Sequence, residues 1–452
     1  MTVLSRSRWK VGLAALAMGV GGALPLVAQV PGPGRLELGF EERVRQERWN
    51  DIIDHNAAAE DARTQDRFRS RLWLDWTPAA DLRIVAGIAN ENRKIVHPDV
   101  ATNGREVFVE TLYADWRIAP RWSLRVGRQN LMRGEGFVLF DGSALDGSRS
   151  AYFNAAALTW SPGKSTLEFL AMSDPGKDQY LPRLNEPANP AEVPRLNEWD
   201  EQALGLYFTG REWAGTTLEA YAFLKTETHD VRPVTNPQFQ PDRRLWTLGS
   251  RVVRDLGRGW TATGEFAGQW GEQAAVPGTA EPPRPITAWG GYARLRKAFE
   301  APGKPALSLG YVGLSGDDPH TRRLEGWDPL FSRWPRWSEL YIYAQIPERG
   351  VAYATNTGMW EAEARLTPTK GLGLRATWYR MNALQAPAAP GPLFGAGTRR
   401  GDLWELRGDV VVDDHWKGNV VYERLSPGSF YSGTAPGAYF RIEVTYAAKV
   451  RL

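Results

Sequence analysis

The chain has 452 residues, of which 24% are charged and 42% hydrophobic, and its mean hydropathy is −0.42. This polarity excludes a bundle of transmembrane helices, because each such helix needs about 20 largely apolar residues. The 20 Trp, 15 Tyr and 16 Phe exclude a disordered chain, and the absence of Cys excludes disulfides, thiolate metal sites and cysteine nucleophiles. With 46 Gly and 31 Pro available for turns, one large closed β structure fits better than several soluble domains.

Residues 1–28 have the pattern of a secretory signal peptide. Arg6, Arg8 and Lys10 precede an apolar run that starts at Val11, and cleavage is expected near Ala28. An uncleaved inner-membrane anchor is the alternative, because the expected lengths overlap. Without these three cations the remaining 52 basic residues equal the 52 acidic ones, so the mature chain 29–452 is predicted to be neutral. No basic run indicates nucleic-acid binding.

Alternation of apolar and polar side chains with period two predicts an all-β chain. At the C-terminus, Phe440, Ile442 and Val444 alternate with Arg441 and Glu443. We predict eighteen strands, at 35–46, 66–77, 81–92, 106–118, 121–130, 150–160, 164–173, 200–210, 215–228, 244–255, 259–270, 286–299, 304–315, 355–367, 371–383, 402–413, 416–424 and 438–452.

The predicted connections alternate between short turns and long loops. The turns include 78–80, 119–120, 161–163 and 414–415, and the long loops are 47–65, 131–149, 174–199, 316–354 and 384–401. This alternation is typical of an antiparallel outer-membrane β-barrel with short periplasmic turns and long extracellular loops. We therefore expect a protein of the bacterial outer membrane, in contact with its lipid and with both termini in the periplasm. The segment 337–346 also reads as a strand, but it is placed inside the loop 316–354 because an odd count would break the alternation.

Tryptophans gather at both ends of the predicted strands, as in the two aromatic girdles of a membrane barrel. One group lies beside the short turns (Trp76, Trp116, Trp122, Trp160, Trp213, Trp260 and Trp416) and the other at the opposite ends (Trp246, Trp270, Trp289, Trp360 and Trp404). A Trp-rich core of a soluble β protein is the alternative.

If the apolar faces meet lipid, the alternate faces line the lumen, and arginine is their commonest charged residue. A ladder of guanidinium groups would attract anions, which suits a polycarboxylate better than a neutral sugar. The alternative is that these arginines pair with lumenal acids and serve structure alone. The candidate pore-lining residues are Arg67, Arg69, Arg71, Arg83, Arg125, Arg251, Glu265, Arg294, Arg296, Arg365 and Arg375.

Catalysis finds little support, because all five His fall in predicted loops or turns and none accompanies a Ser on a strand. We predict no enzyme activity and no cofactor. Asp317, Asp318 and Asp328 offer oxygen ligands for Ca²⁺ in the loop 316–354, but their spacing is not specific, and a solvated loop without metal is favoured.

Four ordered stretches resemble the alginate-export family of outer-membrane barrels. They are 127–131 (GRQNL) with Gly134, 140–142 and 146–149; 247–251 (TLGSR) with 264–271; 304–305 with 309–311 and 315–318 (SGDD); and 328–331 (DPLF). The resemblance implies a monomeric eighteen-stranded barrel with an electropositive constriction, and passive secretion of a polyuronate such as alginate.

The same resemblance implies that Arg128, Arg149, Arg251 and Glu265 line or shape the pathway. Alternation agrees for Arg251 and Glu265, but places Arg128 on the lipid face unless a bulge near Gly127 shifts the register. The predicted turn at 413–415 is too short for the periplasmic plug of the alginate exporter.

Two other readings stay open. The first is an uptake porin for small sugars or organic anions, and the second is a barrel enzyme or a surface binding module that uses the loop 316–354. The expected partners are an anionic polysaccharide or small anions, with periplasmic export partners as an open alternative.

Overall fold

The computed structural model describes residues 34–99, 106–140, 153–182, 184–185, 199–236, 239–332, 337–350 and 353–452. The predicted signal peptide lies outside them. The described chain forms eighteen strands: β1 Arg35–Asn50, β2 Arg63–Ala79, β3 Leu82–His97, β4 Glu106–Ala119, β5 Trp122–Gln129, β6 Phe153–Trp160, β7 Thr166–Asp174, β8 Asp200–Gly210, β9 Thr216–Thr228, β10 Arg243–Gly257, β11 Trp260–Gln273, β12 Arg284–Ala298, β13 Ala306–Leu314, β14 Thr357–Thr369, β15 Leu372–Asn382, β16 Arg399–Val411, β17 Trp416–Pro427 and β18 Gly437–Arg451.

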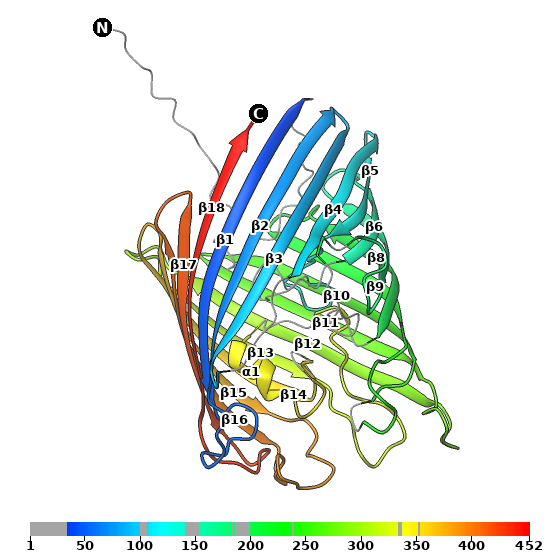
Figure 1. Ribbon diagram of the computed structural model, residues 1–452, viewed down its shortest axis with the longest axis vertical. Coiled ribbons are helices and arrows are strands. Elements are labelled where there is room, and N and C mark those ends of the chain that lie inside the picture. The colour runs from blue at the N-terminus through cyan, green and yellow to red at the C-terminus, as the bar shows by residue number, and fades with distance from the viewer. Residues whose placement is uncertain are drawn as a thin grey trace.

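The strands close into one antiparallel barrel, as the sequence predicts (Figure 1). Each strand pairs with its neighbours in the chain, and β1 also pairs with β18, so that Val44 lies opposite both Phe68 and Val444. A sheet in lipid must have no free strand edge, and closure of the barrel meets this requirement. All eighteen predicted strands coincide with observed ones. The largest differences lie at ends of strands that continue as hydrogen-bonded ladders beyond the apolar pattern, such as β3, which extends to His97.

The two faces of the strands differ as the alternation predicts. In β18, Phe440, Ile442 and Val444 are 39–44% exposed, whereas Arg441 and Thr445 on the other face are buried. Many of the strand-end tryptophans, among them Trp116 and Trp404, are likewise exposed. The outer surface is therefore an apolar band bordered by aromatic side chains, suited to lipid contact.

The interpretation of 337–346 as a strand is wrong, because this segment contains a helix, α1 Glu339–Ala344. Ser338 caps this helix by accepting a hydrogen bond from the Tyr341 backbone N–H. Five of the six helical residues are buried, so the apolar pattern reflects contact on all sides and does not identify a strand. No helix of the described residues is long and apolar enough to cross a membrane.

Two loops fold into the barrel from the extracellular side and fill much of its middle. We call residues 130–140 and 315–332 the inner loops. They meet where Phe137 stacks on Trp327, with ring centroids 5.1 Å apart, and where the Phe331 N–H donates to the Val138 carbonyl at 3.2 Å. Both loops belong to the largest buried apolar cluster of the described chain.

Candidate functional site: an arginine-lined channel

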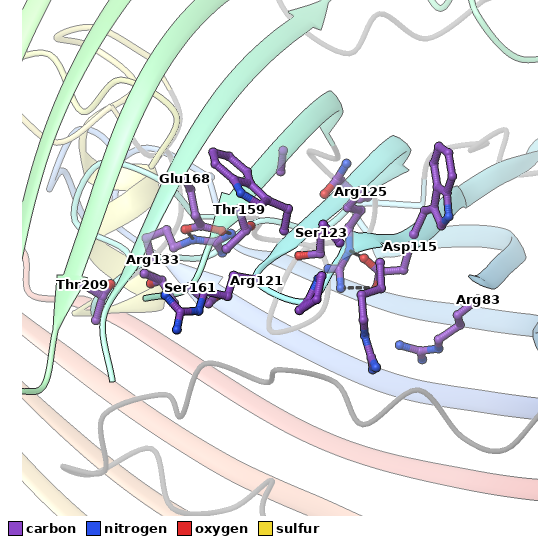
Figure 2. Close-up of a pocket in the computed structure, with 18 of the residues that line it drawn as sticks. Arg83, Asp115, Arg121, Ser123, Arg125, Arg133, Thr159, Ser161, Glu168 and Thr209 are labelled. Atoms are coloured by element: carbon purple, nitrogen blue, oxygen red, sulfur yellow. Dashed lines mark hydrogen bonds and ion pairs between the residues drawn. The ribbon is translucent and has the colours of Figure 1, made fainter. Parts of the chain in front are cut away.

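A cavity of about 320 Å³ opens toward the short-turn side of the barrel, between β3–β9 and the inner loop 130–140. Its lining includes three carboxylates, Asp115, Glu168 and Glu219, and a larger set of arginines. We call these arginines the basic vestibule; they are Arg83, Arg117, Arg121, Arg125, Arg133 and Arg211. Figure 2 shows four of them around the cavity with Asp115 and Glu168.

Part of the basic vestibule is neutralised by ion pairs. Arg125 binds Asp115 at 2.6 Å and Arg133 binds Glu168 at 2.6 Å (Figure 2). Arg83 pairs with Asp75 at 2.6 Å, on the same face of the wall. These pairs fix the planes of three guanidinium groups and reduce their net field.

Arg117 and Arg121 differ from the other arginines of the vestibule. Arg117 lies near the end of β4 and Arg121 lies in the turn before β5, and both are exposed. Among the described residues neither guanidinium has an ion-pair partner. Two cations at the periplasmic entrance are therefore available to a solute.

A second cavity, of about 630 Å³, lies between the wall formed by β1–β5 and the turn between β16 and β17. Its charged lining includes Glu41, Arg71, Lys417 and Lys449. Arg125 lines both cavities, so the two spaces adjoin at this residue.

At mid-barrel, a carboxylate from an inner loop lies between two of the predicted pore arginines. The Glu135 side chain is 3.4 Å from the Arg251 guanidinium and 3.1 Å from that of Arg294. Arg251 also binds Glu219 at 2.6 Å, and Arg294 also binds Glu361 at 3.2 Å. The Glu135 carboxylate is therefore held between two guanidinium groups at mid-barrel.

The preceding glycine makes this arrangement possible. Gly134 has φ +57°, and a Cβ there would lie 3.1 Å from the Arg251 side chain and 3.3 Å from Glu219. Both the left-handed backbone and the close approach favour glycine. Glu265, predicted to face the lumen with Arg251, accepts hydrogen bonds from the Tyr221 and Tyr292 hydroxyls at 3.0 and 2.9 Å.

Helix α1 is held against the barrel wall by charges. The carboxylate of Glu423 on β17 accepts hydrogen bonds from the Ser338 hydroxyl and from the backbone N–H groups of Glu339, at 2.9 Å, and Leu340, at 2.8 Å. Glu339 in turn binds Arg441 of β18 at 2.5 Å. One buried wall carboxylate thus satisfies two of the N-terminal N–H donors of the helix, which have no partners within the helix.

The other predicted pore residues mostly lie in ion pairs along the inner wall. Arg67 binds Glu47 at 3.0 Å, Arg69 binds Glu41 at 2.9 Å, and Arg71 binds Glu110 at 2.6 Å. Arg365 binds Glu363 and Arg375 binds Glu405. Arg296 has no ion pair among the described residues, and its Nε is buried without a hydrogen-bond partner.

Arg128 is placed differently from the rest. Its register partners on β4 and β6 are Leu112, which is 38% exposed, and Asn154, so alternation directs its side chain away from the lumen. There it is 1% exposed and binds Asp178 at 2.7 Å. Although burial opposes the shift, the hydrogen bonds from Arg128 hold the pKa of Asp178 below its ordinary value. This placement argues against a pore-lining role, and Arg149 lies outside the described residues.

Comparison with known proteins identifies the family. A model of a family described as alginate export matches residues 43–444. The chain belongs to the alginate export family. Comparison with curated proteins finds no match.

The solved structures that this chain resembles include several outer-membrane proteins of Pseudomonas aeruginosa. OpdO has 13% identity and a TM-score of 0.57, over 92% of this chain and 98% of its own. OccD3 (OpdP) has 11% identity and a TM-score of 0.54, over 93% of each chain. OccK2 (OpdF), solved in complex with glucuronate, has 12% identity and a TM-score of 0.50, over 92% and 98%. At these identities the likeness shows the fold.

Family and fold place this alginate-export protein in the bacterial outer membrane and point to a channel rather than an enzyme. The loop 316–354, considered above as a surface binding module, instead buries Trp327, Leu330 and Leu340 inside the barrel. Asp328, considered as a calcium ligand, binds Arg243 at 2.6 Å.

Sequence reasoning missed several charged residues of this channel. Arg121, Arg133 and Arg211 lie in turns or loops, where period two carries no information. Glu135 lies in a loop for which the sequence gives no direction. The inward direction of Arg117 could have been predicted from the sequence, because Arg117 shares the face of Asp115 and lies between the outward-facing Trp116 and Ile118.

Proposed function

We propose that this channel passes anionic solutes across the outer membrane without an energy source of its own. The observation that carries the proposal is the basic vestibule, in which Arg117 and Arg121 are exposed and have no ion-pair partner among the described residues. An exposed cluster of like charges at a narrow entrance raises the local concentration of counter-ions. A closed barrel formed by one chain lets each monomer serve as a complete channel.

In this proposal the arginines act as a series of weak sites. A carboxylate entering from the periplasm is bound by Arg117 and Arg121, because guanidinium matches carboxylate geometry. It then exchanges among arginines whose other ligands are protein carboxylates. The existing ion pairs keep each site from binding too tightly, which conduction requires.

We further propose that the solute is an acidic polysaccharide of the alginate type, moving outward. Membership of the alginate export family supports this choice. The neighbour OccK2 (OpdF) was solved with glucuronate, a sugar carrying a carboxylate. A polyuronate presents such a carboxylate on every ring, so it matches repeated arginines better than a neutral sugar does.

One observation favours a second candidate, the uptake of single sugar acids or small organic anions. The inner loops are in contact at mid-barrel through Phe137 and Trp327, and the open cavities lie beside them. A polymer must separate or bypass these loops over its whole length, whereas a monomer needs only a transient gap. The two candidate functions therefore differ in how far, and for how long, the inner loops must separate for the solute to pass.

The test is current block in planar bilayers by uronate oligomers and by monomeric glucuronate, each added to one side at a time. The exporter proposal predicts that oligomers block at lower concentration than monomers and act from the periplasmic side. The double variant Arg117→Gln, Arg121→Gln is expected to weaken block severalfold. The matched control, Arg258→Gln, removes an exposed arginine from another short turn and is expected to change nothing. Equal block by the double variant and the wild type would refute the role of the vestibule.

A further inference from the structure

The extracellular loop between β1 and β2 carries three aspartates that lie close together: Asp51, Asp54 and Asp61. One carboxylate oxygen from each lies within 4.8 Å of the others. Among the described residues, none of the three forms an ion pair with a lysine or an arginine. This contrasts with the lumen, where nearly every carboxylate discussed above has a guanidinium partner.

The loop orients these carboxylates and leaves one oxygen of each available. Asp51 Oδ2 accepts from the Asn50 amide at 2.6 Å, Asp61 Oδ1 from the Asp51 N–H at 2.9 Å, and Asp54 Oδ1 from the Asn56 N–H at 3.1 Å. The other oxygen of each carboxylate has no hydrogen-bond partner among the described residues. The carboxylates are thus oriented by their own loop, and one oxygen of each has room for a further ligand.

Asp51 supplies the independent indication that a ligand belongs there. Asp51 is only 7% exposed, and while its Oδ2 accepts from Asn50, its Oδ1 is buried and has no hydrogen-bond partner among the described residues. A buried carboxylate oxygen without a donor is costly. A cation among the three carboxylates would satisfy this oxygen and remove their mutual repulsion.

We propose that Asp51, Asp54 and Asp61 bind a calcium ion. All three donors are carboxylate oxygens, which hard cations prefer over the nitrogen and sulfur ligands typical of zinc. Calcium tolerates irregular geometry and takes 6–8 oxygens, so water and backbone carbonyls complete the shell, whereas magnesium requires a near-ideal octahedron. His55 lies in the same loop, but its ring packs against Tyr431 at 4.5 Å and is not a ligand in this proposal.

The position of the site indicates what the ion would stabilise. The loop is joined to the connection between β17 and β18 by a hydrogen bond from the Ala435 N–H to the His55 carbonyl at 2.8 Å. Two residues before Asp51, the Trp49 ring stacks on Tyr343 of α1 at 5.0 Å. A bound ion would therefore brace the rim of the barrel directly beside the helix that enters the lumen.

The experiment is calcium titration of the full-length, detergent-solubilised protein, followed by calorimetry and by the luminescence of terbium used as a calcium substitute. We expect one saturable site with a dissociation constant of about 10⁻⁴–10⁻³ M, as in extracellular calcium modules. Calcium should raise the melting temperature. Asp54→Asn and Asp61→Asn change half-buried residues and should each weaken binding at least about tenfold, on the scale set by ligand charge.

Asp242→Asn is the matched control, because Asp242 is an aspartate in another extracellular loop, where it accepts from the His229 N–H. It should bind calcium like the wild type. The heat-dependent gel mobility of the barrel confirms that each variant is folded. Absence of saturable binding in the wild type, or equal binding in Asp54→Asn and Asp61→Asn, would overturn the proposal.

Discussion

Glu135→Gln removes the carboxylate that lies between Arg251 and Arg294. Both arginines keep other partners, Glu219 at 2.6 Å and Glu361 at 3.2 Å, so the wall should stay intact while the lumen gains one positive charge. The Glu135 side chain is 26% exposed, so solvent screens its interaction with a passing ion. We expect the variant to be more anion-selective than the wild type.

The size of the effect follows from Coulomb's law. For an ion passing about 7 Å from the changed charge in water, the energy is about 0.6 kcal/mol. This corresponds to a factor of about 2.7 for each ion, since about 1.4 kcal/mol is tenfold. The permeability of anions should rise and that of cations should fall, each by this factor. The ratio of the two permeabilities should therefore change by about sevenfold at low salt, and by less as salt screens the charge.

The assay is the reversal potential of single channels in a salt gradient, measured for the wild type, Glu135→Gln and Glu281→Gln. The last variant removes an exposed carboxylate from an extracellular loop and controls for the change in net charge. Equal permeability ratios for wild type and Glu135→Gln would show that Glu135 lies outside the ion path. A similar change in Glu281→Gln would attribute the effect to the overall charge.

Three further predictions concern the parts that hold the channel together. Glu423→Ala leaves N-terminal N–H donors of α1 without their acceptor on the wall, which should cost about 1–3 kcal/mol of stability for each buried donor. Single-channel traces should then show larger or noisier conductance. Unchanged traces would mean that α1 is held by other contacts. Asp178→Asn breaks the ion pair between the Asp178 carboxylate and the buried Arg128 and should cost about 3–5 kcal/mol in urea unfolding at neutral pH. Because the folded-state pKa of Asp178 is lowered from 3.8, its contribution is complete above that value and is lost as the pH falls through the lowered pKa, so wild type and variant should converge in acid; a constant difference would contradict this. Gly127 has φ +122°, and Gly127→Ala places a Cβ 2.2 Å from the Leu112 carbonyl oxygen, so this variant should have a lower melting temperature. The control Gly268→Ala, with open space around its Cβ, should not. Equal melting temperatures would refute the strain argument.

The strands and their faces could be predicted from the sequence because lipid imposes one rule on the whole outer surface. Residues that face lipid are predominantly apolar, so the period-two pattern in β18 or around Arg251 gives both the strand and the direction of its side chains. The even number of strands then places the termini on the side of the short turns.

The arrangement inside the barrel could not be predicted in this way. Which acid binds which arginine depends on contacts between distant segments, as in the pair Arg294–Glu135, separated by 159 positions. The inward direction of the loops has no periodic signal. The pattern at 337–346, placed in a loop, does not reveal helix α1, because the acceptor of its N-terminal N–H groups, Glu423, comes from a different part of the chain. Arg128 shows the limit of the family resemblance, since alternation directs its side chain away from the lumen.

The measurement that tests the central claim most directly is the reversal potential of the wild-type channel in a planar bilayer under a KCl gradient, repeated with uronate oligomers on the periplasmic side. An anion-conducting pathway with accessible arginines predicts a reversal potential shifted toward that of chloride, and block by the oligomers. A potential shifted toward that of potassium, together with indifference to uronates, would contradict the account. It would mean that Arg117 and Arg121 lie outside the conducting path and that the lumenal arginines serve structure alone.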